Sequence, residues 1–293
     1  GLYSMEYPSY SIKFMTAFQD TAMEDRQWTS FCPSLSLQYR FNDQYRIYVS
    51  AGRGFRAPIL DDMTRTGKKK GGFVISNPAL KPELLDNYEI GGDIVLFGNL
   101  TLSASAYYSI GHDFMYFVST GDSVNMGYKI APIFQKRNIS KVLIHGLEVD
   151  ADYRLFPFLT LFANYSYSHS EIRDYEMTDP EVDEDLTGKH LTDVPDHKVT
   201  GGLVFRKSGF LVTFNVKYVG ERWINDQNIV EDEYLFTDKY PAYTIFSARA
   251  EKRFFDKFMV GVSIDNIFDR IYVENLTQRN PGRFVVFSGG YYF

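Results

Sequence analysis

Hydrophobic and polar residues alternate along this chain over unusually long segments. Between Leu100 and Ile110 the odd positions are mostly small and polar, whereas the even positions are apolar. After Gly146 the same period of two places four successive charged residues on one face and apolar residues on the other. Because successive side chains of a β-strand point to opposite faces, this period predicts strands with one apolar face and one polar face.

The lengths of the alternating segments indicate a membrane. Strands of soluble proteins average about five or six residues, whereas a strand tilted by about 45° needs about 9 to 11 residues to cross the hydrocarbon layer. Most segments here reach that length, and we predict an all-β fold of about twelve antiparallel transmembrane strands. They lie near residues 9–18, 28–41, 44–54, 84–96, 99–118, 133–155, 158–172, 196–206, 209–224, 241–254, 257–272 and 282–293.

Short and long connections alternate between these segments. Short turns are expected at Asn42-Asp43, Gly98, Phe156-Pro157, Lys207-Ser208 and Asp256, and long connections at 19–27, 55–83, 119–132, 173–195, 225–240 and 273–281. Bacterial outer-membrane barrels have short periplasmic turns and long extracellular loops, an asymmetry that soluble β-sandwiches and propellers do not require. The order therefore predicts an up-and-down β-barrel of the outer membrane of a Gram-negative bacterium.

Aromatic residues gather at the predicted strand ends, where rings with a polar tip favour the lipid headgroup level. Aromatic residues are also good strand formers, so a single cluster does not decide the matter. The last predicted strand carries aromatic and apolar residues on one face and ends in Phe293. It resembles the C-terminal signal by which the barrel-assembly machinery recognises outer-membrane barrels.

Composition and charge exclude several classes of protein. Aromatic residues make up 17% of the chain and charged residues 23%, which suits a surface in contact with lipid on one side and water on the other. The net charge of -6, with no basic run longer than Lys68-Lys69-Lys70, argues against a nucleic-acid partner. Cys32 is the only cysteine, so neither an intrachain disulfide nor a cysteine-based metal site is expected.

The longest uncharged stretch, 94–111, alternates as a strand does, and we expect no transmembrane helix. No basic region followed by an apolar run opens the sequence, so we expect a mature or truncated chain.

Several short motifs carry a family resemblance. In chain order they are GRGFRAP (52–58), NPALKPE (77–83), YEIG (88–91), Asn138, GLE (146–148), VPDH (194–197), DNIFD (265–269) and PGR (281–283). In this order they resemble the pattern of TonB-dependent receptors. Pro58, Pro78 and Pro82 restrict the backbone where the chain leaves and re-enters the sheet, so we interpret the motifs mainly as structural. The motif residues assigned such a role are Phe55, Arg56, Ala57, Pro58, Asn77, Pro78, Pro82, Glu83, Gly146, Glu148, Asn266, Pro281, Gly282, Arg283 and Phe293.

The resemblance implies a 22-stranded barrel with a plugged lumen, of which residues 1–293 would form one partial barrel domain, strands eleven to twenty-two. The N-terminal plug, the first strands and the segment that contacts the TonB complex would lie upstream. Expected partners are the lipid bilayer and lipopolysaccharide, the TonB complex, the barrel-assembly machinery and a small-molecule ligand, and no cofactor is expected.

Charged residues on the polar faces of the predicted strands would point into the lumen. They would contact a plug, line a substrate path or simply form a solvated wall, and the sequence leaves these three roles open. These residues are Glu89, Asp93, Glu148, Asp150, Asp152, Arg154, Lys217, Arg249, Glu251 and Asp265.

The loops offer candidate ligand sites. Arg65, Lys68, Lys69 and Lys70 would attract an anionic iron chelate, whereas the acidic segment 174–193 would be a solvated loop or would bind calcium through carboxylates. The five histidines show no close metal-ligand spacing, and no histidine lies between Pro58 and Asn77. We therefore expect neither a structural zinc site nor a haem ligand of the kind found in some haem receptors.

An enzyme is disfavoured because no nucleophile motif such as G-x-S-x-G occurs, and the dense group 168–171 alternates between two faces. A receptor for TonB-dependent uptake of a scarce nutrient is preferred, with a ferric siderophore as first ligand class and cobalamin, other metal chelates, saccharides or peptides as alternatives. A passive porin or an adhesin barrel is the alternative function.

Overall fold

The structure, a computed structural model, describes residues 27–69, 72–127, 130–175, 185–224, 228, 239–275 and 278–292. The strand expected at 9–18 lies outside these residues. In the described part of the chain, no helix is both long and apolar enough to span a bilayer.

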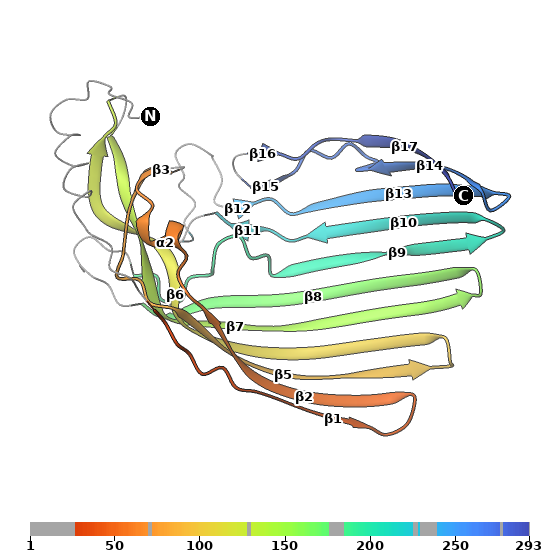
Figure 1. Cartoon of the computed structure of the whole chain (residues 1–293), viewed down its shortest axis with the longest axis horizontal. Helices are drawn as coiled ribbons and strands as arrows, with labels where there is room; N and C mark the ends of the chain where they lie inside the picture. Colours follow the sequence, from red (N-terminus) through yellow and green to blue (C-terminus); the bar gives the residue numbers. More distant parts are fainter. Residues whose placement is uncertain are drawn as a thin grey trace.

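One large sheet contains 13 of the described strands, and the strands along its main path follow one another in chain order (Figure 1). Each long strand pairs antiparallel with the next, which is the up-and-down topology that the sequence predicted. The strands along this path are β1 (Ser34–Arg40), β2 (Tyr45–Arg56), β5 (Glu83–Leu96), β6 (Leu100–Asn125), β7 (Ile130–Phe156), β8 (Leu159–Asp174), β9 (His197–Lys207), β10 (Phe210–Val219), β13 (Tyr243–Phe254), β14 (Phe258–Asp265) and β17 (Phe284–Tyr291).

The expected asymmetry of the connections is confirmed. Tight turns join the strands at one end of the sheet, and the long connections gather at the other end (Figure 1). At the first tight turn the side chain of Asn42 accepts hydrogen bonds from the backbone N–H groups of Gln44 and Tyr45. At the second, Phe97 and Gly98 have φ angles of 54° and 71°, the left-handed backbone that closes a tight hairpin turn.

Two strands are longer than predicted. β6 and β7 contain 26 and 27 residues, more than twice what a bilayer crossing needs, and they extend together past the loop end of the sheet. The connection expected at 119–132 is therefore mostly strand. A buried cluster of Val118, Val142, Ile172, Tyr175 and Leu186 stabilises this extension, and side chains from such distant positions cannot be paired from local periodicity.

Several strands are shorter than predicted, and the one expected at 28–41 begins only at Ser34. The strands expected at 209–224 and 257–272 end at Val219 and Asp265. The second ends because Asn266 adopts a φ of 50° and its side chain bonds both backbone groups of Arg270, which closes a turn.

The long connections carry small elements of their own. The connection after β2 contains α2 (Leu60–Thr64), β3 (Gly67–Lys69) and β4 (Gly72–Ile75), and β4 pairs in parallel with β7. Two further two-stranded sheets are formed by β11 (Arg222–Trp223) with β12 (Lys239–Tyr240) and by β15 (Val273–Asn275) with β16 (Gln278–Arg279).

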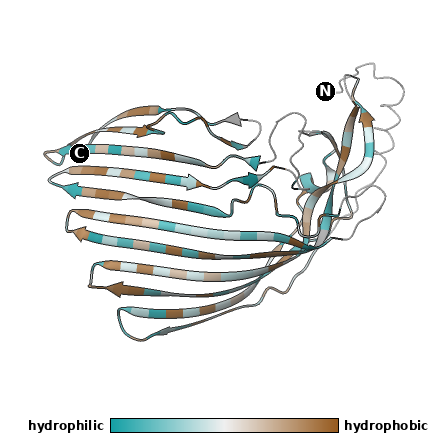
Figure 2. Cartoon of the chain, turned by 180° about the vertical axis from the view of Figure 1, so that it is seen from behind, coloured by the Kyte–Doolittle hydropathy of each residue, from teal (hydrophilic) through white to brown (hydrophobic). Residues whose placement is uncertain are grey.

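Hydrophobic and hydrophilic residues alternate along the long strands (Figure 2). Because successive side chains of a strand point to opposite faces, the sheet has one apolar and one polar face. Large apolar side chains on one face are exposed, among them Leu35, Leu37, Ile47, Val49 and Ile90. An exposed apolar face of this extent is what a lipid-facing surface requires, because lipid supplies the contacts that a soluble protein obtains from its core.

Candidate functional site

The charged residues that we predicted to face the lumen lie together on the polar face of the sheet. Strand register aligns Asp93 with Ser103, Ser103 with Asp150, and Asp150 with Asn164 across four strands. Following the same register across the sheet and along each strand puts all ten residues on one face. They are Glu89, Asp93, Glu148, Asp150, Asp152, Arg154, Lys217, Arg249, Glu251 and Asp265.

Side chains on this face pair with one another around a hollow of about 310 Å³. Arg46 Nε donates to Asp93 Oδ2 over 2.5 Å, and Tyr48 donates its hydroxyl proton to Glu89 Oε1 over 2.6 Å. Asn164 donates to Asp150. Sequence reasoning did not single out Arg46 and Tyr48, although the alternation in 44–54 places both on the polar face. Four carboxylates line the hollow, so this wall is predominantly acidic.

Three glycines of the polar face lie beneath aromatic rings of the neighbouring strand. A Cβ added to Gly91 would lie 2.5 Å from the Tyr48 hydroxyl oxygen, and one added to Gly146 would lie 2.5 Å from that of Tyr107. Gly202 is covered in the same way by Phe162. Aromatic rings laid across glycines are a known means of specifying strand register, so these residues serve the architecture of the wall.

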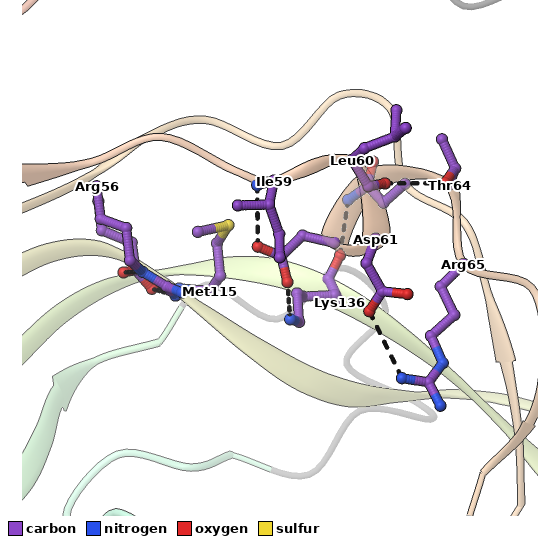
Figure 3. A network of polar contacts seen from close by, with 11 residues as sticks. Arg56, Ile59, Leu60, Asp61, Thr64, Arg65, Met115 and Lys136 are labelled. Atoms are coloured by element: carbon purple, nitrogen blue, oxygen red, sulfur yellow. Dashed lines mark hydrogen bonds and ion pairs between the residues drawn. The ribbon is translucent and has the colours of Figure 1, made fainter.

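The second candidate surface is the loop 57–82, which the family motifs anchor to the β6–β7 extension. Arg56 ends β2 and Glu83 begins β5, and the two side chains form a forked pair (Figure 3). Glu83 also accepts a hydrogen bond of 2.7 Å from the backbone N–H of Met115 in β6. Only 7% of Glu83 is exposed, so both ends of the loop meet at a buried carboxylate.

A second carboxylate holds the helix of this loop. Asp62 in α2 pairs with Lys136 in β7 and accepts a hydrogen bond of 3.2 Å from the backbone N–H of Ile59 (Figure 3). Burial raises the pKa of Asp62, but the hydrogen bonds and the charge of Lys136 outweigh burial and leave the pKa below its usual 3.8.

Two asparagines complete the anchoring. Asn77 donates to the carbonyl of Lys136 over 2.9 Å. Asn138 accepts from the N–H of Lys81 over 2.8 Å and donates to the carbonyls of Lys81 and Asp113. The motif residues therefore satisfy backbone groups and close the loop, which agrees with a structural role.

Acidification should release α2 from the extension. A carboxyl group whose pKa is lowered by folding stabilises the folded state above its unfolded pKa, and this contribution disappears as the pH falls through the folded pKa. The window for Asp62 therefore lies below about pH 4. Trp28 packs against Met63 and Leu80, so its fluorescence, measured with Trp223 replaced by Phe, should shift towards that of an exposed indole in this window.

The control for this titration is Asp62→Asn, which removes the titrating group. We expect its Trp28 emission to lack the transition below pH 4 that the unsubstituted protein shows. An identical acid transition in both proteins would assign the loosening to another group.

Three of the four basic residues predicted to attract a ligand lie in the described part of the same loop. Arg65 follows α2 and forms an exposed ion pair of 3.5 Å with Asp61. Lys68 and Lys69 lie in β3, whereas Lys70 lies outside the described residues. Ile59 and Leu60 next to them are 61% and 67% exposed, so the loop presents both apolar and cationic groups.

The motifs near the C-terminus also meet in space. Asp269 Oδ1 accepts a hydrogen bond of 2.7 Å from the N–H of Arg283, and a Cβ at Gly282 would lie 2.3 Å from the same oxygen. The buried Asn266 closes the turn that holds Asp269, and Pro281 precedes the contact. Phe293 lies outside the described residues.

Two of the histidines, which show no close spacing along the chain, come together in space with an aspartate. His169, His190 and Asp196 offer ligand atoms that all lie within 4.8 Å of one another. The spacing along the chain hid this group because 185–196 returns beside β8, where the N–H of Ser168 donates to the Asp196 carbonyl. Of the acidic segment 174–193, for which calcium binding was one alternative, residues 176–184 lie outside the described residues.

Comparison with known proteins agrees with this architecture. The sequence matches the family TonB dependent receptor-like, beta-barrel over residues 6–267. It is 26% identical to the vitamin B12 transporter BtuB of Photobacterium profundum and 25% identical to the metal-pseudopaline receptor CntO of Pseudomonas aeruginosa. Each match covers 88% of this chain but only 37% and 32% of the respective relative.

The fold is also similar to a solved receptor. The ferric yersiniabactin uptake receptor FyuA from Yersinia pestis superposes with a TM-score of 0.62 at 19% identity, over 89% of this chain and 37% of that one. Proteins of this family reside in the outer membrane of Gram-negative bacteria. The chain belongs to the TonB-dependent receptor-like β-barrel family.

Proposed function

We propose that this chain is the C-terminal part of a receptor that imports a small metal chelate, foremost a ferric siderophore, across the outer membrane. The observation that carries the proposal is the match to the receptor barrel family over residues 6–267. The relatives and the similar structure bear names that refer to vitamin B12, metal-pseudopaline and ferric yersiniabactin, which favours a metal-containing cargo.

In this proposal the two surfaces have separate tasks. The loop 57–82, clamped at Glu83 and Asp62, forms part of the outer binding surface, where its cationic groups attract an anionic chelate. The acidic polar face contacts a plug that the TonB complex displaces through an upstream segment of the whole protein. Residues 1–293 act as one barrel domain, which the assembly machinery recognises through the last strand and which lies among lipopolysaccharide.

The test is ligand binding by the full-length, plug-containing receptor. Calorimetry with iron chelates, cobalamin and glycans should reveal tight binding of one class. If the cargo is an anionic chelate, the double variant Arg65→Glu, Lys68→Glu should weaken binding by about tenfold or more, with the larger loss at low salt. Lys257→Glu, in a tight turn at the opposite end of the sheet, is the matched control and should bind as the unsubstituted receptor does.

The alternative passive barrel makes the opposite prediction. A porin would conduct ions steadily in a planar bilayer, and its transport would not depend on the proton-motive force. Steady conductance without binding of any chelate, cobalamin or glycan would contradict the proposed receptor.

A further inference from the structure

Two histidines and one aspartate converge beside β8. His169 belongs to β8, whereas His190 and Asp196 belong to the segment that returns along it. The ring centroids of His169 and His190 are 4.8 Å apart, and all three residues are partly buried. None of the three belongs to the polar face or to the loop 57–82, so the cluster is separate from the surfaces described above.

We propose that His169, His190 and Asp196 bind a divalent first-row transition metal ion. We judge the geometry of the site by the bond lengths of Zn²⁺. Imidazole nitrogen and carboxylate oxygen are established ligands of Zn²⁺, at about 2.0–2.2 Å from the ion. Tetrahedral bonds of that length separate ligand atoms by roughly 3.4 Å. The ligand atoms already lie within 4.8 Å, so small side-chain rotations complete the site. Three protein ligands leave one position for water.

The backbone around the cluster is held from several directions. The N–H of Ser168 donates to the Asp196 carbonyl over 2.9 Å, and that of Ile172 donates to the Lys189 carbonyl over 2.9 Å. Asn228 exchanges two hydrogen bonds with the backbone of His190. The strand and the returning segment are therefore fixed relative to one another, which reduces the rearrangement that metal binding would require.

The charges near the cluster are compatible with a cation. The ammonium group of Lys239 lies over the Trp223 ring at 4.3 Å and pairs with Glu221, so its positive charge is compensated. Asp196 contributes the carboxylate that balances part of the charge of the ion.

A bound ion would cross-link the loop after β8 to the strand itself. His169 and His190 are far apart in the chain, and the connection between them includes the long stretch 176–184. Metal binding would therefore stabilise one arrangement of this extracellular loop. The ion in this proposal is a resident of the receptor wall and not the transported cargo.

The test uses the full-length receptor, stripped with a chelator and titrated with Zn²⁺ alone, followed by Co²⁺ as a spectroscopic probe. We expect saturable binding of about one Zn²⁺ ion per receptor. Bound Co²⁺ should give an absorption band in the visible range that is typical of low-symmetry coordination. His169→Gln and His190→Gln should each weaken binding by at least about 100-fold, and Asp196→Asn by about tenfold or more. His197→Gln is the matched control, because its ring contacts Tyr165 and Tyr167 beside the cluster and should leave binding unchanged.

Absence of saturable Zn²⁺ binding, or unchanged affinity in both His169→Gln and His190→Gln, would overturn the site. Folding of each variant is checked independently by its heat-modifiable migration in gel electrophoresis. Because the titration contains no chelate ligand and no TonB, its outcome is independent of the receptor function proposed above.

Discussion

Replacing Glu83 by alanine should release the loop 57–82 from the sheet. The substitution removes the ion-pair partner of Arg56 and the acceptor of the hydrogen bond from the Met115 N–H. Both interactions are shielded from water, because only 7% of Glu83 is exposed. Hydrogen bonds to charged groups contribute about 1.5–3 kcal/mol, and the half-exposed Arg56 regains water, so we expect a net loss of about 2–3 kcal/mol. Trypsin cleavage after Arg65 in the folded, full-length receptor should accelerate by about 30- to 150-fold.

The matched control is Glu221→Ala. This residue pairs with Lys239 at another loop, but its side chain is 62% exposed, and exposed ion pairs contribute about 0–1 kcal/mol. Its cleavage rate after Arg65 should stay within a few-fold of the unsubstituted rate. Equal rates for Glu83→Ala and the parent would mean that the loop is held mainly by Asp62 and the two asparagines.

A single methyl group at Gly202 should damage the sheet between β9 and β10. A Cβ there would lie 2.1 Å from the backbone carbonyl oxygen of Phe214 and 2.9 Å from the ring of Phe162. The carbonyl belongs to the strand ladder and cannot rotate away as a flexible side chain could, so the two strands must separate locally. We expect Gly202→Ala to lower the free energy of unfolding by about 1–3 kcal/mol and to reduce the folded yield.

The neighbouring glycine provides the control. A Cβ at Gly201 would meet its nearest atom, the carbonyl oxygen of Phe162, at 3.4 Å. Gly201→Ala should therefore change stability by no more than about 0.5 kcal/mol. Denaturant titration of both variants of the full-length receptor, followed by gel mobility, compares them directly. Equal stability of the two variants would show that the β9–β10 ladder adjusts without cost.

Four motif residues anchor the base of the loop 57–82. Hydrogen bonds at the base of the loop are formed by the side chains of Arg56, Glu83, Asn77 and Asn138. These side chains therefore stabilise the fold. The groups that remain exposed on the loop, such as Ile59 and Leu60, are not part of any motif. The exposed surface of the loop can therefore vary without loss of the hydrogen bonds that anchor its base.

The alternation of residues determined the strands and the two faces of the sheet. Side-chain direction in a strand is a local property with a period of two, so ten charged residues could be assigned to one face without any knowledge of pairing partners. Turn positions were equally readable, because Asn42 and Gly98 are residues whose own chemistry favours tight turns.

Contacts between distant segments were decided only by the tertiary structure. The meeting of Arg56 with Glu83 and of Asp62 with Lys136 depends on how a loop of more than twenty residues returns to the sheet. The convergence of His169 and His190 depends on a chain reversal beyond the end of β8. Local periodicity contains no information about these closures, because many loop paths of similar free energy connect the same two strand ends. The sequence alone thus determined the sheet and its faces, and packing against the β6–β7 extension decided where the loop residues lie.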